Sequence, residues 1–430
     1  MFRWFRIAAS VIALILLSIT TTAQFEPTIV GYIAYVGLDH NVYVLDNAQT
    51  PTQLTLNADV TRRYQFPTWS TDGRLAFFCC DPAFAPEFSV QAFVASPDLT
   101  AAKLLYSADN EGYTYSYWSP GNCDAGPSCR DLALLISQPG QPFRVELIRQ
   151  NGSETTSRTV GSGAPFYFSW NRDGKQMLWH RNNQSISIYD ASIDVSVNTL
   201  ALSSGGLQAP AWSPVDDSAA VTVLEPAGTT LALIVISGDT SRVLVRGIPN
   251  AIRGLANVVA LNWSPDGKFI AYRVINRFGA SPVFVVDAVT GVTTSSTKEP
   301  NVLAFFWSPD SSKLAYVTPS AANGGAGMNS TLIASQPNIQ PLFDWSILNL
   351  STGTTGLLTS FTPTLPMSYL LTYFDQFSQS HRLWSPDSRY LVYGETETGG
   401  TPSVNIIDTS APAPVPLSIA TGEIGIWSFN

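Results

Sequence analysis

The chain alternates between short apolar runs and polar turns along almost its entire length. Leu261-Asn-Trp263 and Phe269-Ile-Ala-Tyr272 favour strands, because β-branched and aromatic residues suit the pleated surface of a sheet. Ser264-Pro-Asp-Gly267 between them is typical of a tight turn, since proline fixes φ at the second position and glycine closes the turn. The stretch therefore predicts a β-hairpin whose first strand ends in tryptophan.

Versions of this hairpin recur through the chain, and in each the first strand ends at a tryptophan. The successive tryptophans are 49, 52, 42, 51, 44 and 77 residues apart. A third strand and usually a fourth follow each hairpin, as at Val283–Asp287 and Val292-Thr293. Repeats of about 40–50 residues with four strands are typical of β-propeller blades. The seven repeat tryptophans are Trp69, Trp118, Trp170, Trp212, Trp263, Trp307 and Trp384.

The two ends of the chain each hold part of a further repeat. Ile424-Gly-Ile-Trp427 is a first strand with no second strand after it, and Gly31-Tyr-Ile-Ala-Tyr35 is a second strand with no tryptophan before it. We expect the C-terminal strand to join the N-terminal blade, because closing the ring removes exposed sheet edges. The sequence thus predicts an all-β fold, a single propeller of four-stranded antiparallel blades. The composite blade brings the count to eight; seven would result if the weak repeat at Trp118 or Trp212 forms no blade.

The Trp-Ser-Pro-Asp-Gly hairpin followed by Leu/Ile-Ala-Tyr resembles the TolB-type, WD-repeat-like propeller repeat. That repeat also occurs in the propellers of the dipeptidyl peptidase IV and prolyl oligopeptidase families. The resemblance covers nearly all residues after about residue 28 and implies the propeller fold. It implies little about activity, because such propellers serve as interaction platforms, ligand binders and lids over enzymes. The peptidases also carry an α/β-hydrolase domain and TolB an N-terminal α/β domain, and we expect neither in this chain.

The N-terminal segment predicts export. Residues 1–23 combine a basic start at Arg3 and Arg6, an apolar run from Ile7 to Ile19 and small residues before Gln24, as a signal peptide does. The apolar run is shorter than the ~18 residues of a spanning helix. We therefore expect cleavage, with an uncleaved anchor as the alternative. Residues 24–430 would form an extracytoplasmic propeller that is secreted, periplasmic or on the cell surface.

The charge balance does not favour a nucleic acid partner. The 430 residues include 23 Lys and Arg against 32 Asp and Glu, and loss of residues 1–23 leaves 21 basic residues. The sequence has no run of Lys or Arg, so the electrostatic footprint for nucleic acid or anionic lipid is missing. We expect a monomer that contacts a membrane only if its N-terminal segment is retained.

The four cysteines fall in two local pairs, Cys79-Cys80 and Cys123-x5-Cys129. The first pair ends a second strand, whereas the second pair lies between a first and a second strand, which places the pairs on opposite faces of the ring. This favours a Cys123–Cys129 disulfide, with either a vicinal Cys79–Cys80 bond or two free thiols, and export permits disulfides. A zinc site is the alternative, disfavoured because no histidine is near. We therefore expect no metal and no cofactor.

One face of the ring is expected to carry the long loops. Residues 319–340 form a Gly/Ala/Asn/Ser-rich loop, and residues 361–382 form a connection rich in aromatic residues. Long loops in compact domains are often functional, and aromatic side chains offer a large contact area. We predict a binding surface there; the alternative is that Tyr369–Phe377 is a short helix or strand packed on the propeller rim. The candidate binding residues are Tyr369, Tyr373, Phe374, Phe377, His381, Arg277 and Phe278.

Catalytic motifs were not found in the sequence. His40, His180 and His381 fall in different repeats without metal-ligand spacing, and no Gly-x-Ser-x-Gly nucleophile elbow is present. The repeat tryptophans and Trp427 share one repeat position, which we interpret as inter-blade packing. We predict a non-catalytic exported propeller that binds a protein or peptide at the long-loop face. The alternative is a cell-surface carbohydrate-binding protein or hydrolase with its site at the mouth of the central channel, which convergent acidic residues there would favour.

Overall fold

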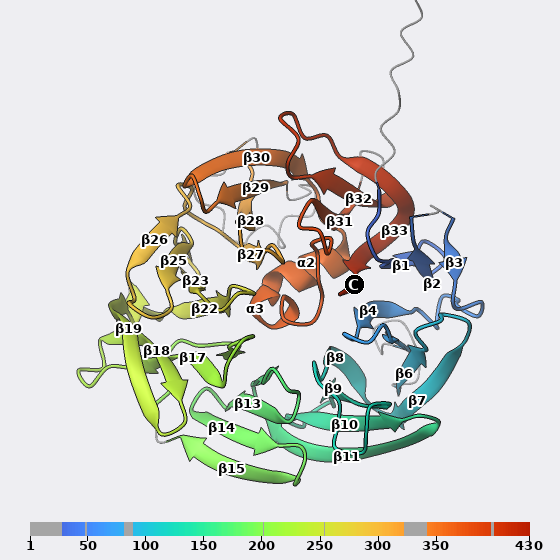
Figure 1. The fold of residues 1–430 in the computed structure, drawn as a ribbon, viewed down its shortest axis with the longest axis horizontal. Helices are drawn as coiled ribbons and strands as arrows, with labels where there is room; N and C mark the ends of the chain where they lie inside the picture. The colour runs from blue at the N-terminus through green and yellow to red at the C-terminus, as the bar shows by residue number, and fades with distance from the viewer. Residues whose placement is uncertain are drawn as a thin grey trace, which may run out of the picture.

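The computed structural model describes residues 28–47, 50–80, 89–200, 202–252, 254–321, 342–396 and 400–430. In this part of the chain, antiparallel sheets stand around a central channel like the blades of a propeller (Figure 1). No helix among these residues is both long enough and apolar enough to cross a bilayer. The all-β propeller predicted from the repeats is therefore the observed architecture.

Five sheets contain four strands each, which follow one another outward from the channel (Figure 1). The first is β4 (Gln65–Trp69), β5 (Leu75–Cys79), β6 (Ser89–Ala95) and β7 (Ala102–Asp109). The second is β8 (Gly112–Trp118), β9 (Cys129–Ser137), β10 (Phe143–Asn151) and β11 (Glu154–Gly163). The third is β12 (Phe166–Trp170), β13 (Gln176–Arg181), β14 (Ser185–Asp190) and β15 (Val195–Leu200). The other two are β16 (Ala211–Trp212), β17 (Ser218–Leu224), β18 (Thr230–Ser237) and β19 (Thr240–Pro249), and β27 (Ala304–Trp307), β28 (Lys313–Pro319), β29 (Phe343–Asn349) and β30 (Thr354–Phe361).

A sixth sheet follows the same order with one addition. It contains β22 (Val258–Trp263), β23 (Phe269–Asn276), β25 (Phe284–Asp287) and β26 (Thr293–Ser296), and the short β24 (Gly279–Ala280) pairs with the end of β23. Before it, β20 (Ala251–Ile252) and β21 (Leu255–Ala256) form a separate two-stranded ribbon.

One long strand closes the ring. The first part of β33 (Leu417–Trp427) pairs with β32 (Pro402–Asp408), and its last residues pair with β1 (Ile33–Gly37), from Gly37↔Gly422 to Ile33↔Trp427. The C-terminal strand therefore joins the N-terminal blade, as the repeat pattern predicted. The resulting six-stranded sheet is completed by β2 (Val42–Leu45), β3 (Thr52–Gln53) and β31 (Tyr390–Thr396).

The blade count differs from the expected eight. The described residues form seven sheets of four or more strands, and hence seven blades. The weak repeats are not the reason, because the repeats of Trp118 and Trp212 each form a complete four-stranded sheet. Instead, the N-terminal and C-terminal repeats are hydrogen-bonded into one sheet through β33.

Burial explains the strand sequences. Second strands such as β5 are buried at every residue, since they are covered on both faces by neighbouring sheets. Strands covered on both faces read as continuous apolar runs. Outer strands such as β11 and β19 are largely exposed and correspondingly rich in Thr, Ser and Arg. Each repeat therefore carries its apolar residues close to the tryptophan and its polar residues far from it.

The repeat turn and its tryptophan are held by hydrogen bonds. In the turn, Ser264 Oγ donates to Asp266 Oδ1 (2.7 Å), and the backbone N–H of Lys268 donates to the same carboxylate (3.1 Å). The indole N–H of most repeat tryptophans donates to a carbonyl of the preceding blade. These bonds join Trp69 to Ile426, Trp118 to Thr68, Trp170 to Tyr117, Trp263 to Ala211, Trp307 to Asn262 and Trp384 to Phe306.

Candidate binding site at the channel mouth

The connection between β30 and Trp384 lies inside the channel and not on the rim. It contains α2 (Leu365–Thr372) and α3 (Phe374–Phe377), which are surrounded by the sheets (Figure 1). Thr364 caps α2 by accepting a hydrogen bond from the N–H of Met367 (3.3 Å), and a proline lies in the first turn, where its missing N–H costs little. We call residues 362–383 the plug.

Hydrogen bonds attach the plug to the innermost strands of several blades. The side chain of Gln376 bonds the backbone of Phe168 in both directions, at 3.1 and 2.6 Å, much as a neighbouring strand would. The Asp375 carboxylate accepts from the N–H of Ala209 (3.1 Å), and Asn262 Nδ2 donates to Ser378 Oγ (2.7 Å). The blades therefore hold the plug at a fixed position.

The aromatic residues of the plug form the core of the channel. The ring of Phe374 lies 4.7 Å from that of Phe305, and the ring of Phe377 lies 5.1 Å from that of Tyr115. Phe374, Phe377 and His381 are at most 1% exposed. The prediction of an accessible surface at these three residues is corrected: they face neighbouring blades, because the channel is lined with apolar side chains that exclude water. The alternative, a short helix or strand over Tyr369–Phe377 packed on the rim, is correct for the helical structure of α2 and α3 but not for their place, which is the channel.

The other candidate binding residues have different surroundings. Tyr373 is 36% exposed, and Tyr369 is half-buried, with its hydroxyl 3.3 Å from the carbonyl of Thr114. Arg277 and Phe278 form an exposed pair beside β24, with the guanidinium 5.1 Å from the ring centroid. The structure thus brings together Tyr369, Phe377 and His381, which all belong to the plug and lie beside the ring of Phe66. Of the loop 319–340, residues 322–340 lie outside the described residues.

His381 is a buried neutral side chain. Its Nε2 lies 2.9 Å from Thr68 Oγ1 and its Nδ1 lies 2.7 Å from Ser380 Oγ. Burial lowers the pKa of His381 to about 3, because the imidazolium form would lose its hydration. The ring therefore acts as a hydrogen-bonded packing group at neutral pH.

Two ionisable groups are buried in the channel: Asp375 belongs to the plug, and Arg273 lies beside it. The guanidinium of Arg273 lies 4.9 Å from the Phe374 ring centroid, and its Nε and Nη1 are buried without a partner among the described residues. Burial lowers the pKa of Arg273 to about 10 and raises that of Asp375, although each charge partly offsets this effect on the other. The attraction between them favours retention of both charges in the channel.

The plug ends in the floor of a cavity. This cavity of about 300 Å³ opens on the face of the repeat turns, since four turn prolines line it. The plug residues Ser378 to Leu383 form the floor of the cavity, and aromatic side chains form much of its wall. The aromatic lining residues are Tyr117, Trp170, Trp212, Trp263, Phe306, Trp307, Trp384 and Phe429, and the prolines are Pro120, Pro214, Pro265 and Pro309. We call this cavity the channel mouth.

Two arginines supply the positive charge of the channel mouth. Arg382 Nη1 donates to the carbonyl of Phe429 (3.2 Å), and its guanidinium carbon lies 4.5 Å from the Phe429 ring centroid. Burial lowers the pKa of Arg382 to about 10, so it stays charged at neutral pH. Arg172 is more exposed and lies 3.7 Å from the exposed Asp217. Among the described residues that line the mouth, none is Asp or Glu.

Neither arginine was among the sequence candidates, although the repeats contain a signal for both. Arg172 occupies the turn position that holds proline in Pro214, Pro265 and Pro309. Arg382 precedes its tryptophan by two residues, where most other repeats have apolar residues such as Leu261. A charged residue that interrupts a structural repeat departs from the packing shared by the other repeats, and comparison of the repeats position by position would have identified both.

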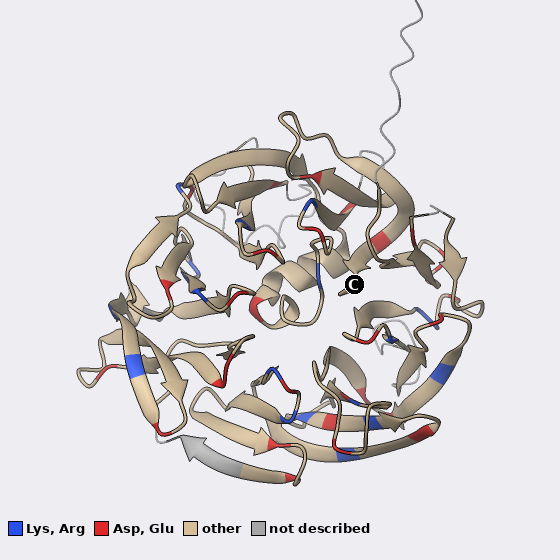
Figure 2. Ribbon diagram, in the orientation of Figure 1, with Lys and Arg blue, Asp and Glu red and all other residues tan. Residues whose placement is uncertain are grey.

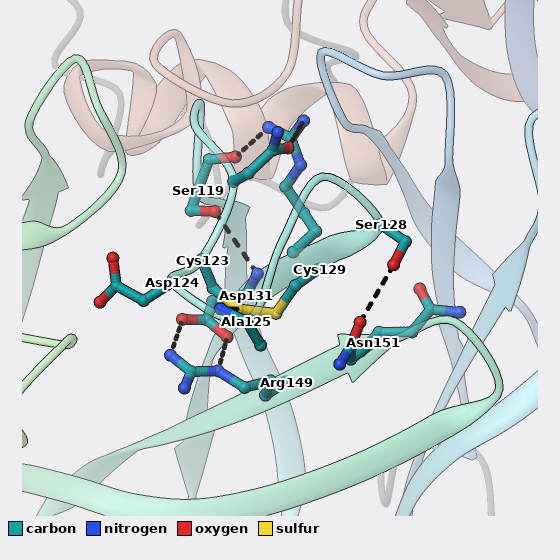
Figure 3. Close-up of a disulfide and its surroundings, with 12 residues drawn as sticks. Ser119, Cys123, Asp124, Ala125, Ser128, Cys129, Asp131, Arg149 and Asn151 are labelled. Carbon is teal, nitrogen blue, oxygen red and sulfur yellow. Dashed lines mark hydrogen bonds and ion pairs between the residues drawn. A yellow bond between two sulfur atoms is a disulfide. The ribbon is translucent and has the colours of Figure 1, made fainter.

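Both cysteine pairs are bonded in the structure, Cys79 to Cys80 and Cys123 to Cys129. Figure 3 shows the second disulfide in the loop between β8 and β9, with Asp131 beside it. The carboxylate of Asp131 accepts two hydrogen bonds from Arg149, both at 2.8 Å. Cys123, Cys129 and Asp131 form a compact group of metal-ligand types. In this arrangement both sulfurs are bonded and the carboxylate is paired, so the group serves as a structural clasp.

Solved structures of low sequence identity are similar to this chain in fold. No protein-family model and no curated protein matches the chain. A eukaryotic initiation factor is 13% identical, with a TM-score of 0.51 over 92% of this chain and 98% of that one. TolB from Acinetobacter baumannii is 13% identical, with a TM-score of 0.37 over 85% and 81% of the two chains. The C-terminal WD40 domain of Sif2 is 11% identical, with a TM-score of 0.47 over 85% and 88%. The structural neighbours of this chain therefore include TolB and WD40 propellers at low identity, and the likeness concerns the fold alone.

Proposed function

We propose that this chain is an exported, non-catalytic β-propeller that binds a protein or peptide partner at the channel mouth. The observation that carries the proposal is the cavity of about 300 Å³, with walls of aromatic residues and a floor formed by the plug. Aromatic side chains in concave sites supply much contact area with little loss of conformational freedom. The site therefore lies on the face of the repeat turns and not on the long-loop face.

Rigidity of the floor supports this proposal. Ser378 is bonded to Asn262, and the side chain of Gln379 donates to the carbonyl of Pro210 (3.2 Å). These bonds attach the floor to two different blades. A site that is already ordered loses less entropy when a partner binds, which leaves more of the contact energy for affinity.

The alternative function at the same place is carbohydrate binding, which the aromatic walls would also serve. The hydrolase version of that alternative has less support, because it needs a pair of carboxyl groups across the bound sugar. The described lining residues of the channel mouth include no Asp or Glu.

Export is part of the proposal. Residues 1–23 lie outside the described residues, and their sequence pattern, together with two disulfides, supports an extracytoplasmic location. We expect the purified mature protein to begin at or near Gln24. Mass spectrometry of the protein from its source organism checks this, and an intact N-terminus at Met1 in a cytoplasmic fraction would contradict it.

Site-specific photo-crosslinking tests the binding function. A benzoylphenylalanine in place of Arg172 puts a reactive group at the channel mouth, and the same residue in place of Arg246 puts it on the outer strand β19. Both arginine side chains are more than half exposed, so the substitutions are matched in burial. We expect a protein adduct from position 172 but not from position 246. Equal labelling at both positions, or none at position 172, would refute binding at the mouth.

A further inference from the structure

We propose that the channel mouth recognises a carboxylate side chain of the bound peptide, and that Arg382 and Arg172 select for it. This inference rests on the proposed function and names the chemistry of its partner. It starts from a charge contrast. The whole chain is acidic, with a formal net charge of −9, and Figure 2 shows both signs scattered around the ring. The described residues lining the mouth nevertheless include two arginines and no acid.

The neighbouring acidic groups do not neutralise these arginines. Asp217 lies 3.7 Å from Arg172, but both side chains are more than half exposed, and such pairs are weak in water. Asp216 also interacts with Arg172, but its carboxylate accepts a hydrogen bond from the N–H of Ser218 (3.0 Å). The turn carboxylate of Asp266 is engaged by Ser264 Oγ, by a backbone N–H and by the ammonium of Lys268 at 3.1 Å. The mouth therefore keeps a positive charge that a ligand anion can meet.

Arg382 is held in a geometry that suits a carboxylate. Its Nη1 bonds the carbonyl of Phe429, and the Phe429 ring lies against the guanidinium. Among the described residues this guanidinium makes no other hydrogen bond. Its remaining nitrogens, Nε and Nη2, are not fully buried. The Nε–Nη2 edge can therefore form the paired hydrogen bonds that arginine makes with a carboxylate.

The walls strengthen the interaction and define what accompanies the acid. The Phe429 ring beside Arg382 reduces water access to that guanidinium, and a charge-assisted hydrogen bond is stronger where water is excluded. Trp263 and Trp307 are partly exposed in the mouth and can pack against an apolar neighbour of the acidic residue. The ligand that fits is a peptide with Asp or Glu next to an apolar side chain.

The test is an array of short peptides that each pair an apolar residue with Glu, beside twins in which Gln replaces Glu. The probe is the disulfide-intact protein, residues 24–430. We expect Glu peptides to bind about tenfold or more tightly than their Gln twins, as for hydrogen bonds to charged groups. Arg382→Gln and Arg172→Gln should each reduce this preference, and Arg246→Gln should leave it unchanged. Arg172→Gln keeps the test valid if Arg382→Gln fails to fold, since Arg172 is largely exposed.

The outcomes separate the two proposals. If Glu peptides and Gln twins bind equally well, carboxylate recognition is wrong while the binding function stands. If no peptide in the array binds and the crosslinker at position 172 labels no protein, the binding function fails as well. A Glu preference that persists in both arginine variants would assign the selection to other residues and overturn the inference.

Discussion

Adjacent residues of the plug differ sharply in what they contact. Phe374 is fully buried against Phe305 and Arg273, whereas its neighbour Tyr373 is 36% exposed. Both are aromatic, and both lie in a connection that is polar at its ends. Their contributions to stability therefore depend on the direction each side chain takes and not on residue type.

Replacement of Phe374 by alanine should lower the free energy of unfolding by about 3–5 kcal/mol, because it leaves a cavity in a well-packed channel. Tyr373→Ala is the matched control and should cost less than about 1 kcal/mol, since its ring already contacts water. Urea denaturation of the two variants measures both values. Similar losses in the two variants would mean that the plug does not pack as described.

His381 makes stability depend on pH. The unfolded chain has a histidine pKa near about 6.5, whereas burial lowers that of folded His381 to about 3. Between these values only the unfolded chain binds the proton, so stability falls as the pH drops, by up to about 1.4 kcal/mol per unit. His381→Gln should flatten this dependence. Unfolding curves at several pH values compare the slopes, and equal slopes for both proteins would contradict the assignment.

At this scale the sequence could identify apolar residues but not what they face. Phe377 packs on Tyr115, which is more than 250 residues earlier in the chain. An aromatic residue that meets a ligand and one that meets a distant blade look alike, because both prefer to leave water. The repeat tryptophans were easier to interpret, since recurrence at one position indicates a shared partner in every blade.

The plug is the element that the repeat pattern does not contain. Its helix α2 buries Met367, Leu370 and Leu371 while Leu365 stays exposed. The three buried residues lie at i, i+3 and i+4, as on one face of a helix, but α2 has only eight residues and also exposes a leucine, so periodicity alone does not reveal it. The strands, by contrast, were predictable from the turns that separate them. The walls of the channel mouth are therefore formed by repeat residues, which the sequence pattern predicts, whereas its floor is formed by plug residues, which the pattern does not predict.

Gly394 allows the start of the plug to approach the sheet. A Cβ at this position would overlap the carbonyl oxygen of Glu423 and lie 2.8 Å from Thr364 Oγ1. Gly394→Ala should therefore lower the free energy of unfolding by about 1–3 kcal/mol through overpacking. Gly356→Ala is the control, because a Cβ there would lie 4.0 Å from the Ile347 side chain, at ordinary van der Waals distance. Thermal denaturation distinguishes them, and an unaffected Gly394→Ala protein would show that the contact is not tight.

At the scale of the whole molecule, closure and the disulfide clasp limit how far the chain can open. Cys123 and Cys129 have Cα atoms 5.3 Å apart and close a short loop between β8 and β9. The double substitution of both cysteines by serine should lower the free energy of unfolding by about 2 kcal/mol, as expected for a short loop. Ser128→Ala, in the same loop, should change it by less than about 0.5 kcal/mol. Denaturant titration of both variants provides the test, and an unchanged midpoint for the double variant would contradict it.

The repeats predicted the ring and its closure because each unit contains the same hairpin with a strand that ends in tryptophan. They overestimated the number of separate sheets, since nothing local in Ile424–Trp427 shows that this segment also continues the strand that pairs with β32. Sharing of one strand by two repeats is a property of the closed ring. It becomes visible only when the ends of the chain are placed side by side.

The late position of the plug has a consequence for biosynthesis. Strands β8 and β12 are made early, but the residues that cover Tyr115 and Phe168 follow about 200 residues or more later. A chain that emerges N-terminus first therefore presents an open arc of blades with an uncovered centre until residues 362–383 arrive, and the ring closes only when β33 follows. During that interval its inner aromatic residues are available to chaperones, and the plug meets blades that are not yet closed into a ring. The timing of translation, and not sequence alone, thus becomes part of how this protein reaches its native state.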